Sequence, residues 1–261
     1  MYRPRIIPVL LLQNGALVKT ISFGKRKYIG DPINALHILN SMQANEIVLL
    51  DIDATKKNSV IDINLVKKIG EEAFMPFSVG GGIRTCAQIA ERIALGTEKV
   101  ILNSIVFEDL NFVKEAASQF GSSSLVCCMD IKKNWFGKYH IVKKGGRKKI
   151  KGDIVDWAKR IEEAGIGEII VQSVDRDGRM IGYDLKLLQM IAKNVKVPVI
   201  ALGGAADINS LKEILNSKIP INGLAAGSMF VYHGARNGVL VNYPSTEEIL
   251  DLYKNLETGI R

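Results

Sequence analysis

The chain has 261 residues, of which 47% are hydrophobic and 24% are charged, with 35 Lys and Arg against 27 Asp and Glu. These proportions are those of a globular chain and exclude a disordered or fibrous protein. The formal charge of +8 favours anionic partners such as phosphorylated metabolites, nucleotides or nucleic acid.

Eight short runs rich in Val, Ile and Leu predict strands that are buried on both faces, as in a parallel sheet. They cover residues 6–12, 47–53, 76–80, 99–104, 124–131, 168–175, 197–203 and 221–227. Segments of helical period follow them and predict helices over 33–44, 61–73, 87–95, 110–120, 154–165, 185–194, 208–217 and 246–256. We expect the last helix to begin with a capping box formed by Ser245 and Glu248.

Strands and helices therefore alternate from one end of the chain to the other. Parallel strands need crossover helices, and eight such units in a chain of this length predict an α/β fold with a single (β/α)₈ barrel, the TIM barrel. The alternative is an open doubly wound sheet. No stretch of linker composition divides the chain, so we expect one domain over residues 1–261.

The two halves of the chain repeat three features at offsets of 122 to 124 residues. Glycines end the third and seventh predicted strands, and aspartate-containing turns end the second and sixth. Asn103-Ser104 ends the fourth strand, and Gly227-Ser228 ends the eighth. Because three matches in register are rare by chance, we expect a duplicated half-barrel with halves of about 1–121 and 122–261.

Each half offers a candidate phosphate site, because glycine lets the backbone approach a ligand and a helix N-terminus suits an anion. The first site is predicted at Gly81, Gly82, Asn103 and Ser104, and the second at Asp177, Gly178, Gly203, Gly204, Gly227 and Ser228. Two such sites on one barrel mouth would hold a ligand with a phosphate at each end. The alternative is that these glycines only form tight turns.

Asp130 is the predicted general acid or base. It ends the very apolar run Leu125–Met129, and a partly desolvated carboxyl at a strand end suits proton transfer. The alternative is a helix or loop cap. The half-barrel repeat places Leu11 opposite Asp130, and leucine cannot take or give a proton.

Two basic segments follow the first and fifth strands. Lys19 and the loop with Lys25, Arg26 and Lys27 could fold over an anionic substrate or remain a solvated loop. A second basic run covers residues 143–151. The preceding segment 139–142 and the glycine pair Gly145-Gly146 within the run predict a small hairpin. Aromatic residues do not interleave with these runs as single-stranded nucleic-acid binding requires, so we expect no nucleic-acid partner.

The opposite end of the barrel carries a charge signal. Four charged residues each stand just before a buried strand: Arg5, Glu46, Lys99 and Glu168. Two positive and two negative charges balance, as buried charges must, and would form a ring that controls access to the barrel axis. The alternative is four separate solvated strand starts.

We expect no metal, no cofactor and no membrane partner. The apolar run near the start is far shorter than the roughly 20 residues that a spanning helix needs. The few cysteines fit a reducing compartment and predict a cytoplasmic protein. The residues that could bind a metal are scattered, and they are Cys86, Cys127, Cys128, His37, His140 and His233.

Over nearly its whole length the chain resembles the cyclase subunit of imidazole glycerol phosphate synthase. The resemblance rests on Gly15, Lys19, Asn103-Ser104 and the segments 5–8, 30–32, 80–84, 145–148, 175–178, 182–184 and 203–205. It implies a (β/α)₈ barrel that takes ammonia from a glutaminase subunit docked at the barrel bottom. The ammonia would pass a charged gate, matched here by Arg5, Glu46, Lys99 and Glu168, to a bisphosphorylated ribulosyl substrate.

The same resemblance implies two catalytic aspartates. Asp130 matches one of them, and Leu11 stands at the place of the other. Gln172 replaces the usual threonine in the substrate site, and Leu202 replaces a serine. The phosphate frame and the gate are thus kept, while the centre of the site differs.

Segments 6–12, 27–32, 132–139, 230–234 and 239–244 look still more like a branch of this family associated with glycosyl amidation in bacterial surface-polysaccharide pathways. That branch implies a glutaminase that makes ammonia and a barrel that conveys it. A separate sugar amidotransferase then converts an acetamido to an acetamidino group on a surface sugar, such as one of a lipopolysaccharide O-antigen. The barrel's ligand would be a phosphorylated small molecule or a nucleotide sugar.

Three functions follow from these resemblances. The first is the synthase subunit of such a glutamine-dependent amidation system. The second is a true imidazole glycerol phosphate synthase cyclase of histidine biosynthesis, against which Leu11 argues, because the loss of one member of an acid/base pair removes about 10²–10⁴ in rate. The third is a non-catalytic ammonia channel or activator of the glutaminase.

Overall fold

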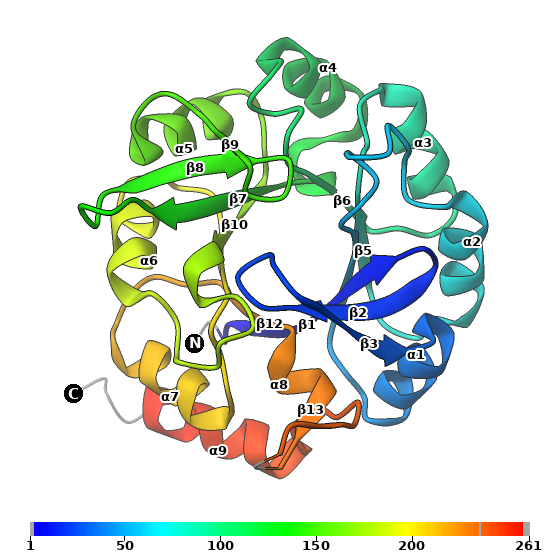
Figure 1. Cartoon of the computed structure of the whole chain (residues 1–261), viewed down its shortest axis with the longest axis vertical. Coiled ribbons are helices and arrows are strands. Elements are labelled where there is room, and N and C mark those ends of the chain that lie inside the picture. Colours follow the sequence, from blue (N-terminus) through cyan, green and yellow to red (C-terminus); the bar gives the residue numbers. More distant parts are fainter. Residues whose placement is uncertain (1–2, 235, 258–261) are drawn as a thin grey trace.

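Eight parallel strands close into a barrel in the computed structural model, which describes residues 3–234 and 236–257 (Figure 1). Pairing runs in chain order around the barrel, and β12 closes it by pairing with β1. The barrel strands are β1 (Arg5–Gln13), β4 (Ile47–Asp51), β5 (Phe77–Gly80), β6 (Lys99–Leu102), β7 (Leu125–Lys133), β10 (Glu168–Ser173), β11 (Val199–Leu202) and β12 (Gly223–Ala226). The predicted (β/α)₈ barrel is confirmed, and the open sheet is excluded.

Helices surround the barrel, and each begins close to its predicted start (Figure 1). Asp or Thr side chains cap the first seven by accepting backbone N–H bonds, and the predicted capping box of Ser245 and Glu248 is present. None of the helices in the described ranges is long and apolar enough to cross a membrane. The helices are α1 (Pro32–Ser41), α2 (Ile63–Glu72), α3 (Cys86–Ala94), α4 (Leu110–Phe120), α5 (Ile154–Glu163), α6 (Leu185–Ala192), α7 (Ile208–Asn216) and α9 (Thr246–Glu257).

Two barrel strands continue beyond the barrel into antiparallel hairpins. β1 pairs with β2 (Ala16–Thr20), which pairs with β3 (Arg26–Gly30), and β7 pairs with β8 (Tyr139–Lys143), which pairs with β9 (Lys148–Lys149). The hairpin expected at 139–142 is confirmed. The basic loop expected around Lys25–Lys27 is wrong in part, because Arg26 and Lys27 belong to β3. That strand is largely exposed and polar, so it lacks the alternation that reveals a half-buried strand.

The first strand of each predicted half thus carries the same kind of hairpin, which supports a duplication. The division into halves and the extent of the domain over residues 1–261 stay predictions. Short elements that the sequence pattern does not predict follow β12, namely α8 (Ser228–Val231), β13 (Tyr232–His233) and β14 (Gly238–Val239).

The barrel interior is an apolar column. Side chains that alternate along the strands fill it, while a larger apolar cluster packs the outside of the strands against the helices. Leu11 and Leu50 pack at the edge of the inner cluster. The inner cluster consists of Ile7, Val9, Val48, Ile101, Val126, Cys128, Ile170, Ile200, Leu202 and Ala225.

Candidate functional site

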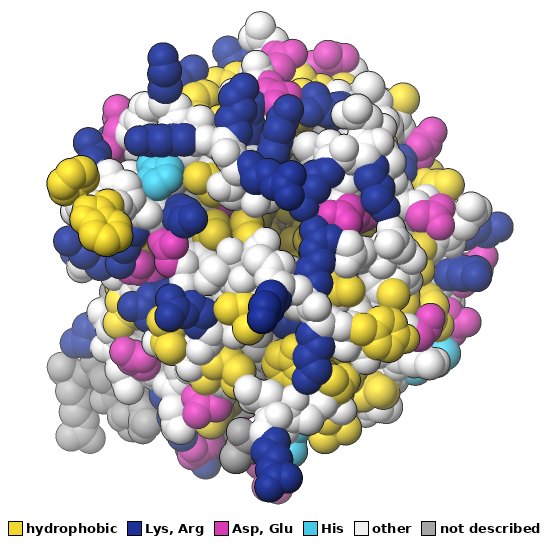
Figure 2. Space-filling view, viewed as in Figure 1, with side chains coloured by type: hydrophobic (Ala, Val, Ile, Leu, Met, Phe, Trp, Pro, Cys, Tyr) yellow, Lys and Arg dark blue, Asp and Glu magenta, His cyan; other side chains and the backbone are white. Residues whose placement is uncertain are grey.

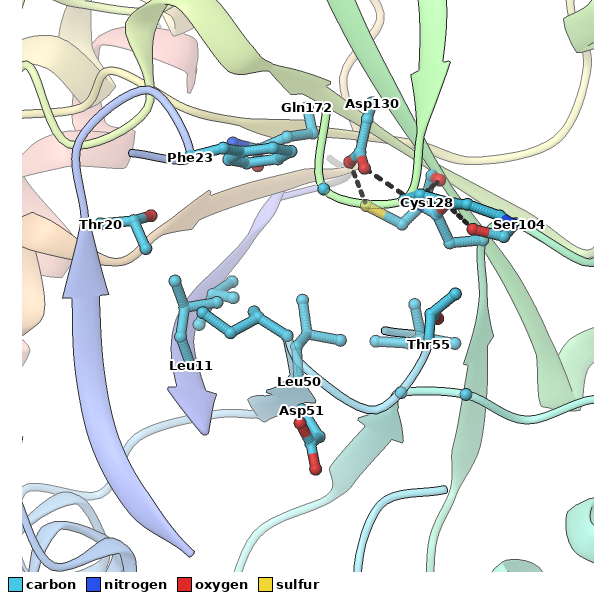
Figure 3. A pocket seen from close by; sticks show the side chains of 18 of the residues that line it. Leu11, Thr20, Phe23, Leu50, Asp51, Thr55, Ser104, Cys128, Asp130 and Gln172 are labelled. Atoms are coloured by element: carbon cyan, nitrogen blue, oxygen red, sulfur yellow. Dashed lines mark hydrogen bonds between the residues drawn. The ribbon is translucent and has the colours of Figure 1, made fainter. Parts of the chain in front are cut away.

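A pocket opens at the C-terminal ends of the barrel strands, inside the ring of hairpins and loops (Figure 3). Ten of the predicted catalytic and substrate-binding positions line it, and they are Leu11, Lys19, Gly81, Gly82, Asn103, Ser104, Asp130, Gln172, Asp177 and Gly227. Gly178 and Ser228 follow two of these residues in the chain but are not among the lining residues, and neither are Gly203 and Gly204. The structure therefore brings residues of both predicted phosphate sites to one cavity.

Asp130 is buried near the end of β7 and faces this cavity. The side-chain amide of Asn103 donates a hydrogen bond of 3.0 Å to Asp130 Oδ2, and Cys128 Sγ lies 3.7 Å from Oδ1. Burial raises the pKa of Asp130 to about 7, although the bonds from Asn103 and Cys128 act in the opposite direction. A carboxyl with this pKa can take or give a proton near neutral pH.

The side of the cavity that faces Asp130 is apolar. Figure 3 shows Leu11 and Leu50 on one side, and Asp130 and Cys128 on the other. Leu202 at the end of β11 also lines the cavity. Two other carboxylates line the cavity, and both have partners: Asp51 accepts the backbone N–H groups of Asp53 and Ala54, and Asp177 pairs with Lys19.

Lys19 and Asp177 form a buried ion pair. Lys19 Nζ lies 2.8 Å from Asp177 Oδ1, and the hydroxyl of Thr20 donates to Asp177 Oδ2 over 2.6 Å. This pair could not be predicted from the sequence, because its members are far apart in the chain. Because the carboxylate already balances the ammonium, Lys19 offers an anion less charge than an unpaired lysine would.

A second ion pair, between Arg26 and Asp53, lies at the side of the pocket. Both terminal nitrogens of Arg26 lie 2.7 Å from oxygens of Asp53, and Gln13 donates to the same carboxylate over 2.6 Å. These bonds, above all those from Arg26, hold the pKa of Asp53 well below its usual range. The sequence placed Arg26 in a basic loop, and only the β2–β3 pairing reveals that it reaches the pocket.

Several turn glycines are explained by close packing of the chain. Gly82 and Gly178 have φ of +70° and +68°, and a side chain at either would collide with a carbonyl oxygen of another loop, Ser59 O or Thr20 O. Both positions therefore require glycine whether or not a ligand is bound. For these two glycines, the need for a tight turn is a sufficient explanation, and no phosphate site is required.

The hydroxyl of Ser228 is a different case. It is buried and has no hydrogen-bond partner among the described residues, directly after the pocket residue Gly227. A buried hydroxyl usually has a partner, so this group can still donate to a ligand anion.

The other end of the barrel carries the charged ring. Arg5 bridges two carboxylates, with one terminal nitrogen 2.6 Å from Glu46 Oε2 and the other against Glu168. Lys99 Nζ lies 3.2 Å from Glu168 Oε2. Burial raises the pKa of Glu46, and the charge of Arg5 opposes that rise. The four residues thus form one connected ionic group below the apolar column.

Comparison with known proteins identifies the family. A profile described as "Histidine biosynthesis protein" matches residues 5–236. The chain belongs to this family. It is 41% identical over 249 residues to the "Putative imidazole glycerol phosphate synthase subunit hisF2" of Pseudomonas aeruginosa, covering 95% of this chain and 99% of that protein. It is 40% identical over 233 residues to the "Imidazole glycerol phosphate synthase subunit HisF" of Alkaliphilus metalliredigens, covering 89% and 92%.

Membership of the histidine biosynthesis protein family confirms the family resemblance found in the sequence. The two relatives are named as imidazole glycerol phosphate synthase subunits, and their names do not mention a surface sugar. They therefore favour the second of the three predicted functions over the first. The roles of the individual site residues stay predictions.

Proposed function

We propose that the chain is the ammonia-using synthase subunit of a glutamine amidotransferase of the imidazole glycerol phosphate synthase type. One observation carries the proposal: a single barrel has the balanced ring of Arg5, Glu46, Lys99 and Glu168 at one end and the Asp130 pocket at the other, with an apolar interior between them. A glutaminase would dock against the ring, and ammonia would reach the pocket through the barrel.

In this proposal Asp130 handles the proton of the reacting nitrogen. A bond from ammonia to carbon releases a proton, and a carboxyl with a pKa of about 7 can take it at neutral pH. Asn103 holds the carboxyl in place through its 3.0 Å bond. The Cys128 thiol is not a second base, because burial raises its pKa well above the ordinary value.

The ligand is proposed to be a phosphorylated small molecule. Among the residues that the structure describes, five cationic side chains line the pocket, and of these only Lys19 is deeply buried. The free hydroxyl of Ser228 adds a donor beside Gly227. The other four cations are Arg26, Lys56, Arg84 and Lys144.

The first candidate reaction is the cyclase step of histidine biosynthesis, which the names of the relatives support. The second is ammonia supply to a separate sugar amidotransferase that forms an acetamidino group on a bacterial surface sugar. The apolar pocket side of Leu11, Leu50 and Leu202 favours the second, because Leu11 stands where the family resemblance implies the second catalytic aspartate. In the second candidate, ammonia would pass the pocket and be consumed elsewhere.

Complementation of a histidine auxotroph that lacks the cyclase separates the two candidates. Growth with the wild-type chain, and its loss with Asp130→Asn, would establish the cyclase. Failure of a well-expressed wild-type chain would leave the sugar pathway. In a second assay the purified chain is mixed with its glutaminase. A rise in glutamine hydrolysis without turnover of any phosphorylated ligand would identify a channel or activator. A glutaminase that neither binds nor responds would refute the whole proposal.

A further inference from the structure

The excess of basic over acidic residues in this protein comes from one segment. Residues 131–151, which we call the basic arm, contain nine Lys and Arg and no Asp or Glu. Of the 35 basic and 27 acidic residues of the chain, 26 and 27 lie outside the basic arm, so the rest of the chain is close to neutral. The arm comprises the end of β7, β8, β9 and their turns.

Most of these charges face solvent. Lys133 pairs with Asp184 over 3.1 Å and Lys143 with Glu108 over 2.7 Å, and both lysines hold the arm to the barrel. Figure 2 shows Lys and Arg side chains gathered over β8 and β9 and around the pocket mouth. The exposed cations of the arm are Lys132, Lys138, Lys144, Arg147, Lys148, Lys149 and Lys151.

The turn between β7 and β8 also exposes two aromatic side chains. Trp135 is 97% exposed and Phe136 is 91% exposed, which is unusual for side chains of this size. The turn that carries them is well bonded: Asn134 and Lys138 exchange two hydrogen bonds of 2.9 Å, and Gly137 N donates to Asn134 O over 2.9 Å. The aromatic rings are thus held out in solvent by an ordered turn, so a partner need not order it first.

We propose that the basic arm docks this protein onto a bilayer that contains anionic phospholipid, with Trp135 and Phe136 entering the headgroup region. Adjacent aromatic and lysine side chains are typical of membrane interfaces, and basic clusters are drawn to anionic lipid. Protein interfaces, by contrast, are depleted in lysine. A single-stranded nucleic acid needs aromatics spaced along its path, whereas here both lie at one turn.

This proposal departs from the expectation of no membrane partner, which rested on the absence of a spanning segment. Docking needs no such segment. The basic arm extends from β7, whose end carries Asp130, so the pocket mouth and the arm lie at the same end of the barrel. Docking would hold that end near the bilayer, where a membrane-bound acceptor could receive ammonia or product.

The test is co-sedimentation of the full chain with vesicles of phosphatidylcholine alone or with 30% phosphatidylglycerol, at about 0.1 M salt. We expect binding to the anionic vesicles only. Trp135→Ser with Phe136→Ser should weaken it about ten-fold or more. Lys148→Glu with Lys149→Glu should weaken it at least about 20-fold, since each basic residue near an anionic surface strengthens binding about five-fold.

Matched controls separate docking from general effects. Lys67→Glu with Lys68→Glu, exposed on α2, changes the net charge equally and should leave binding unchanged, as should Phe74→Ser, an aromatic 88% exposed outside the arm. Lipids brominated in the upper acyl chain should quench Trp135 fluorescence, and Trp135→Phe should bind but lose that quenching.

Absence of binding to anionic vesicles would overturn the proposal, and so would equal weakening by the α2 control. Tighter binding to a single-stranded oligonucleotide than to vesicles would also overturn it and assign the arm to nucleic acid. The assay involves neither glutaminase nor turnover, so its failure would leave the proposed function untouched.

Discussion

Asn103 donates its side-chain amide hydrogen to Asp130 across 3.0 Å, and the two residues lie at the ends of neighbouring strands β6 and β7. The bond stabilises the ionised carboxyl, whereas burial disfavours it more strongly, and the pKa of Asp130 settles at about 7. The unfolded chain would titrate the same group near 4. This difference makes the stability of the protein depend on pH in a defined direction.

Relative to the wild-type chain, Asp130→Asn should raise the free energy of unfolding more at pH 8 than at pH 5. The folded wild-type chain keeps the proton up to about pH 7, so the contribution of Asp130 to the free energy of unfolding falls as pH rises from about 4 to 7, by on the order of 4 kcal/mol. Asparagine has no such proton, and urea unfolding of both chains at the two pH values measures the difference. An equal effect of the substitution at pH 5 and pH 8 would contradict the raised pKa.

Asp53→Asn is the matched control. The bonds from Arg26 depress the pKa of Asp53, so its stabilising contribution is lost only as pH falls below the ordinary range of aspartate. The substitution should therefore destabilise the protein by a similar amount at pH 5 and pH 8.

Leu11→Asp should not give full cyclase activity. The new carboxyl would enter the edge of the inner apolar cluster, lower the free energy of unfolding by about 1–3 kcal/mol and raise the pKa of Asp130 further through like charge. Gln172 and Leu202 would still line the altered site. Turnover of the bisphosphorylated ribulosyl substrate with ammonium salt as nitrogen source tests this without a partner. Full activity would show that the site is otherwise intact.

Lys99→Ala should uncouple glutamine hydrolysis from ammonia delivery. Lys99 pairs with Glu168 at 3.2 Å, and its removal leaves Arg5 to balance both carboxylates of the ring. We expect the ratio of glutamate formed to nitrogen delivered to rise several-fold in the complex with the glutaminase. Lys67→Ala on α2 is the control. An unchanged ratio would argue against passage through the ring.

Gly178→Ala should destabilise the protein far more than Gly15→Ala. Both glycines have positive φ, +68° and +78°, so each substitution costs about 1 kcal/mol in backbone strain. At Gly178 the added carbon would also strike the carbonyl oxygen of Thr20, whereas at Gly15 nothing lies within 4 Å. We expect at least about 2 kcal/mol more loss at Gly178 in urea unfolding. Equal losses would show that the loop yields freely.

The barrel could be predicted from the sequence because its strands are buried on both faces. Such strands appear as unbroken apolar runs, and polar residues mark where they emerge at the mouth. For the same reason Asn103 and Asp130 could both be assigned to the barrel mouth, whereas the hydrogen bond between them was not predicted. The hairpin strand β3 could not be predicted, because it carries the exposed side chains Lys27 and Tyr28 and lacks an apolar face.

The ion pairs of the pocket could not be predicted either. Lys19 and Asp177 are 158 positions apart, and their pairing depends on how β2 folds back over the mouth. The sequence identified both as binding residues, since charge at a strand end fits a ligand as well as it fits a partner. What distinguishes the two cases is burial of both groups at 2.8 Å, which only the fold supplies.

Strand β1 carries an ionic residue, Arg5, at its lower end and Leu11 at its upper end, six positions along. Because side chains of a strand alternate between its faces, an even spacing keeps both directed to the inside, roughly 20 Å apart. Loss or gain of one residue between them would turn one of the two outward. A point substitution at position 11 therefore changes the pocket without moving Arg5, whereas a one-residue insertion or deletion between them would disturb either the pocket or the ionic ring.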